Sequence, residues 1–130
     1  MNLTNLVMQS YGRCCVSPAF FDDFYRHFLA SSPQVRDKFA STDMTAQKTL
    51  LRQGILNLVM YARGMPDTKL RALGESHSRG RLDIRPELYD LWQEALLRTI
   101  AEHDGEYGEE IRAAWRDVLQ KGINVIKSYY

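Results

Sequence analysis

Apolar residues recur along most of this chain at the three- and four-residue spacing of amphipathic helices. Four prolines, at positions 18, 33, 66 and 86, separate the periodic stretches, and each one marks the start of a new helical segment. No stretch alternates apolar and polar residues for long enough to support a β-strand. The pattern therefore predicts an all-α fold.

The first predicted helix begins at Ser17-Pro18, because serine caps helix starts and proline is tolerated in the first turn. This helix ends near residues 30–32, and a short helical turn follows from Pro33 to Phe39. Its broad apolar face consists of Phe20, Phe21, Phe24, Tyr25, Phe28 and Leu29.

Four further helices are predicted in the rest of the chain. A long one begins at the caps Thr42 and Asp43 and is stopped by Arg63-Gly64. A shorter one follows Pro66 and is broken by Gly80. Another long helix starts at Pro86, and after the polar loop HDGEYGEE the last helix spans the apolar positions 111–126.

Composition limits the architecture and the partners of the chain. Its 130 residues, 45% hydrophobic and 25% charged, predict one globular domain over residues 1–130 that needs no disulfide or structural metal. A net charge of +1 lacks the basic excess of a nucleic-acid binder. The longest strongly apolar stretch, residues 55–62, is far shorter than the roughly 20 residues of a membrane span. Because the amino terminus resembles no signal peptide, we expect a cytoplasmic protein.

The cysteines and histidines are the first candidates for chemistry. Cys14 and Cys15 are adjacent and too close for ordinary disulfide geometry, so they are interpreted as small, partly buried side chains. His27 and His103 are expected in surface hydrogen bonds, and three histidines scattered in this way do not predict a zinc site. Only His77 continues an apolar helix face. One imidazole suffices for a haem iron, since the porphyrin supplies the other four ligands.

Several phrases of the sequence are similar to those of bacterial single-domain globins. They are Phe24-Tyr25, the fourteen-residue step to Phe39, KFASTDMTAQKTLL, and SHSRGRLDIRPELYDLW. The chain most closely resembles the globins related to flavohaemoglobin heads and globin-coupled sensor domains. The resemblance implies a globin fold, a three-over-three helical sandwich around haem b (iron protoporphyrin IX).

The resemblance also implies which residues contact the haem on its proximal side. It makes His77 the ligand of the iron and Phe39 the aromatic ring that packs on the porphyrin face. Leu73, Ile84 and Tyr89 complete the expected contacts. The ring nitrogen of His77 that does not bind iron should donate either to the carbonyl of Leu73 or to Tyr89, which would fix the orientation of the ring.

On the distal side, Tyr25 matches the tyrosine whose hydroxyl points at a bound gas, a hydrogen bond worth roughly 1–2 kcal/mol. Gln47 is the match for the second polar position, with Leu51 one turn further on covering the iron. Helical periodicity leaves a second register open, in which a shift of three residues brings Leu50 and Gly54 to these places.

These residues predict a protein that reversibly binds dioxygen, nitric oxide or carbon monoxide for storage, delivery or sensing. The alternative is a haem enzyme for nitric-oxide dioxygenation or for nitrite or peroxide chemistry. That enzyme would need a separate reductase, because the chain has no glycine-rich dinucleotide fingerprint. A third reading, a globin fold that has lost its haem and serves as an interaction module, is disfavoured by His77 and Tyr25. No catalytic residue is assigned.

Charged and aromatic surface residues suggest two further contacts. Arg79, Arg81 and Lys48 are candidates to orient the two propionates of the porphyrin, although surface ion pairs contribute only about 0–1 kcal/mol each. A helical surface that ends in Tyr129 and Tyr130 is compatible with a homodimer.

Overall fold

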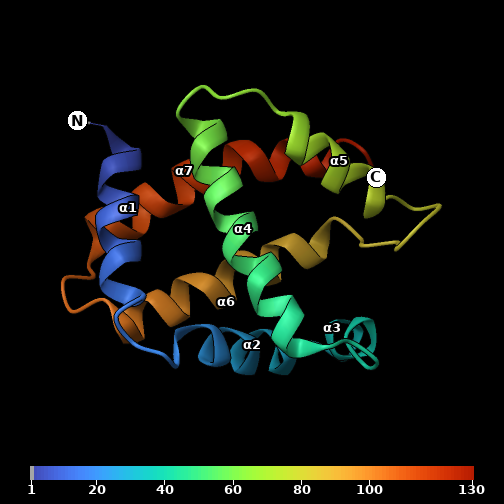
Figure 1. Cartoon of the computed structure of the whole chain (residues 1–130), viewed down its shortest axis with the longest axis horizontal. Coiled ribbons are helices and arrows are strands. Elements are labelled where there is room, and N and C mark those ends of the chain that lie inside the picture. The colour runs from blue at the N-terminus through green and yellow to red at the C-terminus, as the bar shows by residue number, and fades with distance from the viewer. Residues whose placement is uncertain (1) are drawn as a thin grey trace.

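The computed structural model describes residues 2–130, which form seven helices and no strand (Figure 1). The all-α architecture expected from the periodicity is therefore confirmed for these residues. The helices are α1 (Leu3–Cys14), α2 (Phe20–Ala30), α3 (Pro33–Lys38), α4 (Met44–Ala62), α5 (Thr68–Ser76), α6 (Glu87–His103) and α7 (Glu109–Lys127).

Most helix boundaries follow the capping signals in the sequence. The Asp43 side chain accepts hydrogen bonds from the backbone amides of the first turn of α4, and Gly64 takes a positive φ of 105° just after that helix ends. The start of α2 differs from the expectation. The Ser17 hydroxyl accepts from the backbone amide of Ala19, so it closes a turn, and the helix begins at Phe20.

The helix α1 was not predicted from the sequence. Val7, Tyr11 and Cys14 are buried at helical spacing, and the Asn2 side chain caps the first turn. The apolar periodicity is hidden because two of the inward positions, Thr4 and Ser10, are polar.

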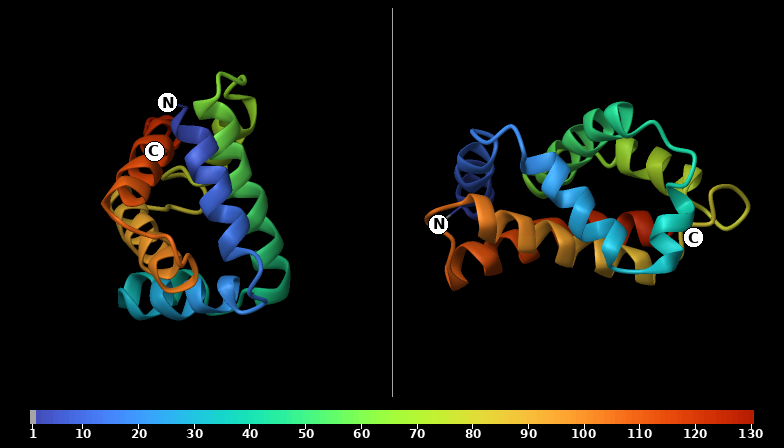
Figure 2. Two further views of the ribbon diagram at one scale, coloured as in Figure 1. Left: turned by 90° about the vertical axis from the view of Figure 1, so that its left-hand side faces the viewer. Right: turned by 90° about the horizontal axis from the view of Figure 1, so that it is seen from below.

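The helices pack in two sets, one around α7 and one around α6. Helices α1, α4 and α5 all contact α7, whereas α2 lies along α6. Figure 2 shows α1 and α4 side by side on one side of the molecule and the α6–α7 pair on the other. Close approach of α4 and α7 depends on Gly122, where a methyl group would overlap the Leu58 side chain.

A buried polar network ties α1 to the end of α6. The Asp104 carboxylate accepts from the Ser10 hydroxyl and from Nε of Arg13, both at 2.6 Å. Trp115 donates from its indole nitrogen to the same serine oxygen at 3.0 Å. Burial opposes ionisation of Asp104, but the hydrogen bonds from Arg13 and Ser10 outweigh it and lower the pKa of the carboxyl group.

Two further sequence expectations concern the cysteines and the membrane. Cys14 is buried, whereas Cys15 is exposed and so differs from the partly buried side chain expected; both thiols are free. Within residues 2–130, no helix combines the length and the apolar character that a membrane crossing requires.

Candidate functional site

His77 lies at the point where α5 ends and the chain turns back. Its backbone amide donates to the carbonyl of Leu73 at 3.0 Å, closing the last turn of the helix. Its own carbonyl accepts from the amide of Ile84 at 2.9 Å, which folds the α5–α6 loop over the histidine. These two hydrogen bonds, one to a residue before His77 and one from a residue after it, fix the backbone that carries the half-buried imidazole.

The ring of His77 is oriented by Tyr89, which lies in the first turn of α6. Nδ1 of His77 is 2.8 Å from the phenol oxygen, and the two rings are tilted by 31°. The carbonyl of Leu73, the other partner expected from the sequence, accepts instead from the Ser76 hydroxyl and the His77 backbone amide. The contact with Tyr89 leaves Nε2 as the imidazole nitrogen that is available to a ligand.

Burial sets the protonation of this pair. It lowers the pKa of His77, which favours the neutral imidazole, and it raises the pKa of Tyr89, which keeps the phenol protonated. When Nδ1 carries the proton and donates it to the phenol oxygen, Nε2 presents a lone pair. The pair is therefore chemically suited to bind a metal ion through Nε2.

A second polar group, the hydroxyl of Tyr25, is buried between α2 and the first turn of α4. Only 5% of Tyr25 is exposed, and its hydroxyl donates to the backbone carbonyl of Gln47 over a long 3.3 Å. Burial raises the pKa of Tyr25 to about 12, so the phenol is a hydrogen-bond donor at neutral pH. The Phe39 ring packs edge-on against it, with 5.9 Å between the centroids.

The residues of the two registers considered for the distal position differ in how far α4 buries them. Leu51 is buried and Gln47 is half-buried, whereas Leu50 is 56% exposed and Gly54 is partly exposed. The structure thus brings Gln47 to Tyr25 through its backbone carbonyl. Leu50, in contrast, presents a large apolar side chain with nothing covering it among the described residues.

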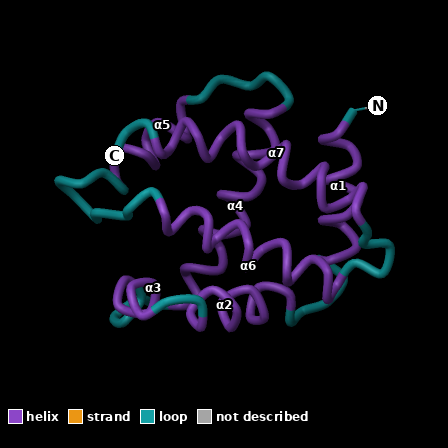
Figure 3. The backbone as a smooth tube through the Cα atoms, turned by 180° about the vertical axis from the view of Figure 1, so that it is seen from behind, coloured by secondary structure: helices purple, strands orange, loops and turns teal. Residues whose placement is uncertain are grey.

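The two groups of predicted residues lie toward the same end of the molecule. Tyr25, Phe39 and Gln47 form one group, on α2, α3 and α4, and His77 with Tyr89 belongs to the other. Figures 1 and 3 show α3 and the α5–α6 loop at the same end. A hydrogen bond from Nζ of Lys38 to the carbonyl of Leu82 joins them at 2.9 Å.

The chain terminus also holds the loop after His77, a role that the sequence reasoning missed. The Tyr130 hydroxyl donates to the Asp83 carboxylate at 2.6 Å, and the Arg79 guanidinium lies 4.8 Å above the tyrosine ring. Arg79 and Arg81 are exposed, whereas Lys48 pairs with Asp22. The only sequence signal for this contact is the pair of terminal tyrosines, which was interpreted as a surface for dimers.

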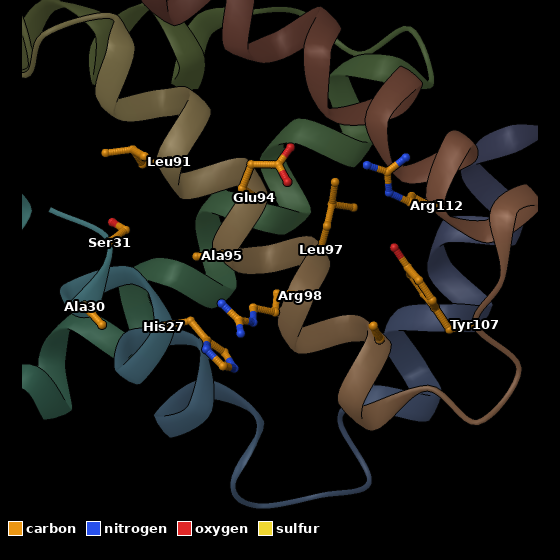
Figure 4. A pocket seen from close by; sticks show the side chains of 11 residues that line it. His27, Ala30, Ser31, Leu91, Glu94, Ala95, Leu97, Arg98, Tyr107 and Arg112 are labelled. Carbon is orange, nitrogen blue, oxygen red and sulfur yellow. The ribbon is translucent and has the colours of Figure 1, made fainter.

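Two cavities are described in the structure, one away from these two groups and one beside the loop that follows His77. One of about 420 Å³ opens between α2, α6 and α7 (Figure 4), and another of about 460 Å³ lies beside Tyr130. Neither is lined by Tyr25 or His77. The first is lined by His27, Ala30, Ser31, Leu91, Glu94, Ala95, Leu97, Arg98, Ala101, Tyr107 and Arg112.

The residues present fit a large, flat, apolar group with a metal at its centre. Nε2 of His77 would be the metal ligand, and the Tyr25 hydroxyl would be a buried donor. Leu50 on α4 and Leu82 on the α5–α6 loop are 56% and 57% exposed, although leucine gains by burial.

The chain resembles known proteins along most of its length. The family model described as Globin matches residues 22–126. A crystal structure of a Pseudomonas aeruginosa PAO1 protein, described as structurally highly homologous to a human hemoglobin, is 74% identical and superimposes with a TM-score of 0.98. The match covers 99% of this chain and 98% of that chain. A search among curated proteins found no significant match.

Proposed function

Since this chain belongs to the globin family of haem proteins, we propose that it holds haem b between α4 and α5 and reversibly binds dioxygen or another diatomic gas. The bacterial single-domain globin and the globin fold expected from the sequence are confirmed by the family match and by the bacterial relative. The observation that supports the function best is the His77–Tyr89 pair, which frees Nε2 as a metal ligand.

A haem bound here supplies the iron atom to which a diatomic gas attaches. His77 would hold that iron through Nε2 on the proximal side, and Tyr89 keeps the imidazole in the tautomer whose lone pair lies on Nε2. Leu73 and Ile84 flank the histidine and are both partly buried against the core. Their apolar side chains would help to exclude water from the proximal face of a bound haem.

Tyr25 stabilises the gas on the distal side. Its hydroxyl now bonds the Gln47 carbonyl at 3.3 Å, a length at which hydrogen bonds are weak, so it can turn to a stronger acceptor at small cost. A diatomic gas with partial negative charge would be such an acceptor. Gln47 contributes a second polar side chain beside it, and Leu50 or Leu51 supplies the apolar cover according to the register of α4.

The partner of His77 also bears on the alternative of peroxide chemistry. A carboxylate on Nδ1 would make the imidazole strongly basic and would favour cleavage of a bound peroxide, whereas Tyr89 is a neutral phenol that is kept protonated by burial. The geometry therefore favours gas binding. Nitric-oxide dioxygenation with a separate reductase uses the same residues and is distinguished by turnover.

The experiment that tests this function is spectroscopic. We expect the purified protein to take up one hemin per chain, to show a strong Soret band, and to form a stable dioxygen complex after reduction. His77→Ala should lose this haem retention, and added imidazole should restore the proximal ligand. As a matched control, His27→Ala should keep the spectrum. A protein that fails to bind hemin, or unchanged spectra in His77→Ala, would refute the proposal.

A further inference from the structure

A second group of ligand-type side chains lies between α2 and α6, far from His77. It consists of Asp23 and His27 on α2 and of Glu102 and His103 in the last turn of α6, and we call it the α2–α6 cluster. His103 follows Tyr89 by fourteen residues on the same helix, which corresponds to about 20 Å at 1.5 Å per residue. The cluster is therefore separate from the proposed iron ligand and its partner Tyr89.

The fold brings these four residues together although 75 to 80 positions separate the contacting partners. Nε2 of His103 lies 2.7 Å from a carboxylate oxygen of Asp23, and Nε2 of His27 lies 2.8 Å from Oε1 of Glu102. Asp23 and His27 share one side of α2 because they are four residues apart. Sequence reasoning treated the two histidines as isolated, since each is alone in its own segment.

Three ligand atoms of the cluster already lie close to the spacing of a metal site. One atom each from Asp23, Glu102 and His103 falls within 4.8 Å of the other two. Ligands bound at about 2.0–2.1 Å in a tetrahedral zinc site are about 3.3 Å apart, so small side-chain rotations would close the set. His27 contacts Glu102 and orients its carboxylate, as the outer hydrogen bonds of metal sites do.

The cluster is sheltered but open to solvent on one side. The His27 and His103 side chains are 10% and 13% exposed, whereas Glu102 is 41% exposed. The edge of the Phe20 ring packs against the His103 imidazole. Figure 4 shows His27 on the side of α2 that faces α6, at the rim of the cavity there. An ion can therefore reach the carboxylates, while packing holds the imidazoles.

Charge supports a cation at this place. The two carboxylates face one weakly held guanidinium, because Arg26 lies 3.5 Å from Asp23 and 3.8 Å from Glu102 and its side chain is 61% exposed. Arg26 can move into solvent at small cost. A divalent ion in its place would neutralise both carboxylates.

We propose that Asp23, Glu102 and His103 bind a divalent transition-metal ion such as Zn²⁺, with His27 as a positioning residue and solvent completing the coordination. The donor set selects this class of ion. Imidazole nitrogen mixed with carboxylate oxygen suits Zn²⁺ and its neighbours in the first transition row, whereas Ca²⁺ and Mg²⁺ prefer oxygen ligands alone.

The test is calorimetric titration of Zn²⁺ into the full chain after chelator treatment and desalting, with equilibrium dialysis and metal analysis as the second measurement. We expect one Zn²⁺ per chain at the cluster. Asp23→Asn and His103→Gln should each weaken binding by at least about tenfold, and His27→Gln should weaken it less. Asp22→Asn, a carboxylate on the same helix outside the cluster, should leave the affinity unchanged.

Arg26→Ala separates a metal site from a merely structural network of ion pairs. It removes the competing cation, so zinc should bind several-fold more tightly. Circular dichroism and thermal unfolding of each variant verify that it is folded. Absence of stoichiometric zinc binding to the unaltered chain, or binding that survives both Asp23→Asn and His103→Gln, would overturn the proposal. Hemin uptake is a separate readout, so the gas-binding function stands or falls independently.

Discussion

Nδ1 of His77 and the phenol oxygen of Tyr89 are 2.8 Å apart, although one residue caps the end of α5 and the other lies in the first turn of α6. This contact joins the two ends of the α5–α6 loop through side chains, and the hydrogen bond from Ile84 to the carbonyl of His77 joins them through the backbone. Orientation of the imidazole is thus determined by the loop closure. Nε2 points away from the partner and is the nitrogen that the proposed function assigns to the iron.

Replacement of Tyr89 by Phe should loosen the proposed iron ligand without removing it. The variant loses one hydrogen bond to a half-buried imidazole, worth about 1 kcal/mol, so hemin should dissociate several-fold faster. The imidazole also becomes a weaker electron donor, and the iron–histidine stretching frequency in resonance Raman spectra should fall. An unshifted frequency would mean that Tyr89 does not orient the iron ligand.

Tyr25→Phe tests the distal donor. The change removes only the hydroxyl, while the ring keeps its packing against Phe39. Dioxygen should then dissociate about tenfold faster, because one hydrogen bond to the bound gas is lost. Stopped-flow measurement against carbon monoxide gives the rate. Tyr107→Phe, on the α6–α7 connection, is the matched control, and a Tyr25→Phe rate equal to that of this control would remove Tyr25 from the gas site.

The fold was largely predictable because residues close to the helix ends signal where most helices begin and end. Asp43 caps α4 through its own carboxylate, and Gly64 ends it with a positive φ, so short-range signals sufficed there. The helix α1 escaped prediction because its inward face includes Thr4 and Ser10, and their burial depends on partners far along the chain. Ser10 is satisfied by Asp104 and Trp115, 94 and 105 residues away.

The candidate site likewise has one part that local sequence predicts and another part that depends on long-range contacts. The position of His77 after an apolar helix face was visible in the sequence, and Tyr89 was one of two partners considered for it. The choice between Tyr89 and the carbonyl of Leu73 depends on loop closure, which no local pattern encodes. The pairing of His27 with Glu102 is likewise a product of how α2 crosses α6. The haem-contacting roles of these residues stay predictions.

Asp104 makes the stability of the fold depend on acid pH. Its pKa in the folded protein is lowered from the ordinary value of 3.8, so the charged form stabilises the native state above that value. This contribution is lost as the pH falls below 3.8 toward the native pKa, because the unfolded chain binds the proton first. Asp104→Asn should therefore lose stability at pH 7 and show a shallower decline on acidification.

Urea unfolding at pH 7 and at pH 3 measures both effects. Asp104→Ala, which leaves the partly buried Arg13 without its carboxylate, should cost about 3 kcal/mol at pH 7. Asp117→Asn serves as the control, because that carboxylate is half-exposed and pairs only with Lys121 at 3.6 Å. Equal pH slopes for Asp104→Asn and the unaltered protein would show that the network does not couple to folding.

The last contact that bears on the site is the one between the chain terminus and the α5–α6 loop. Asp83 has a φ of 51°, a left-handed conformation that is uncommon for residues other than glycine, although aspartate and asparagine adopt it more readily than most. Its backbone amide donates to the carbonyl of Ser78, and its carboxylate accepts from Tyr130. These two bonds hold the loop whose next residue, Ile84, is bonded to His77.

Tyr130→Phe should release this loop while leaving the rest of the fold in place. The variant removes the bond to Asp83, so the amide of Ile84 should exchange its hydrogen several-fold faster, and hemin should be lost faster because His77 is held less firmly. Asp83→Asn is the matched control, since the amide oxygen can still accept and asparagine tolerates a positive φ. Asp83→Ala should show the full effect, because it loses the acceptor and adds backbone strain. Hydrogen exchange with mass spectrometry measures the loop directly, without haem. Equal exchange in Tyr130→Phe and the unaltered chain would mean that the terminus only rests on the loop, and any change in hemin loss would then need another cause.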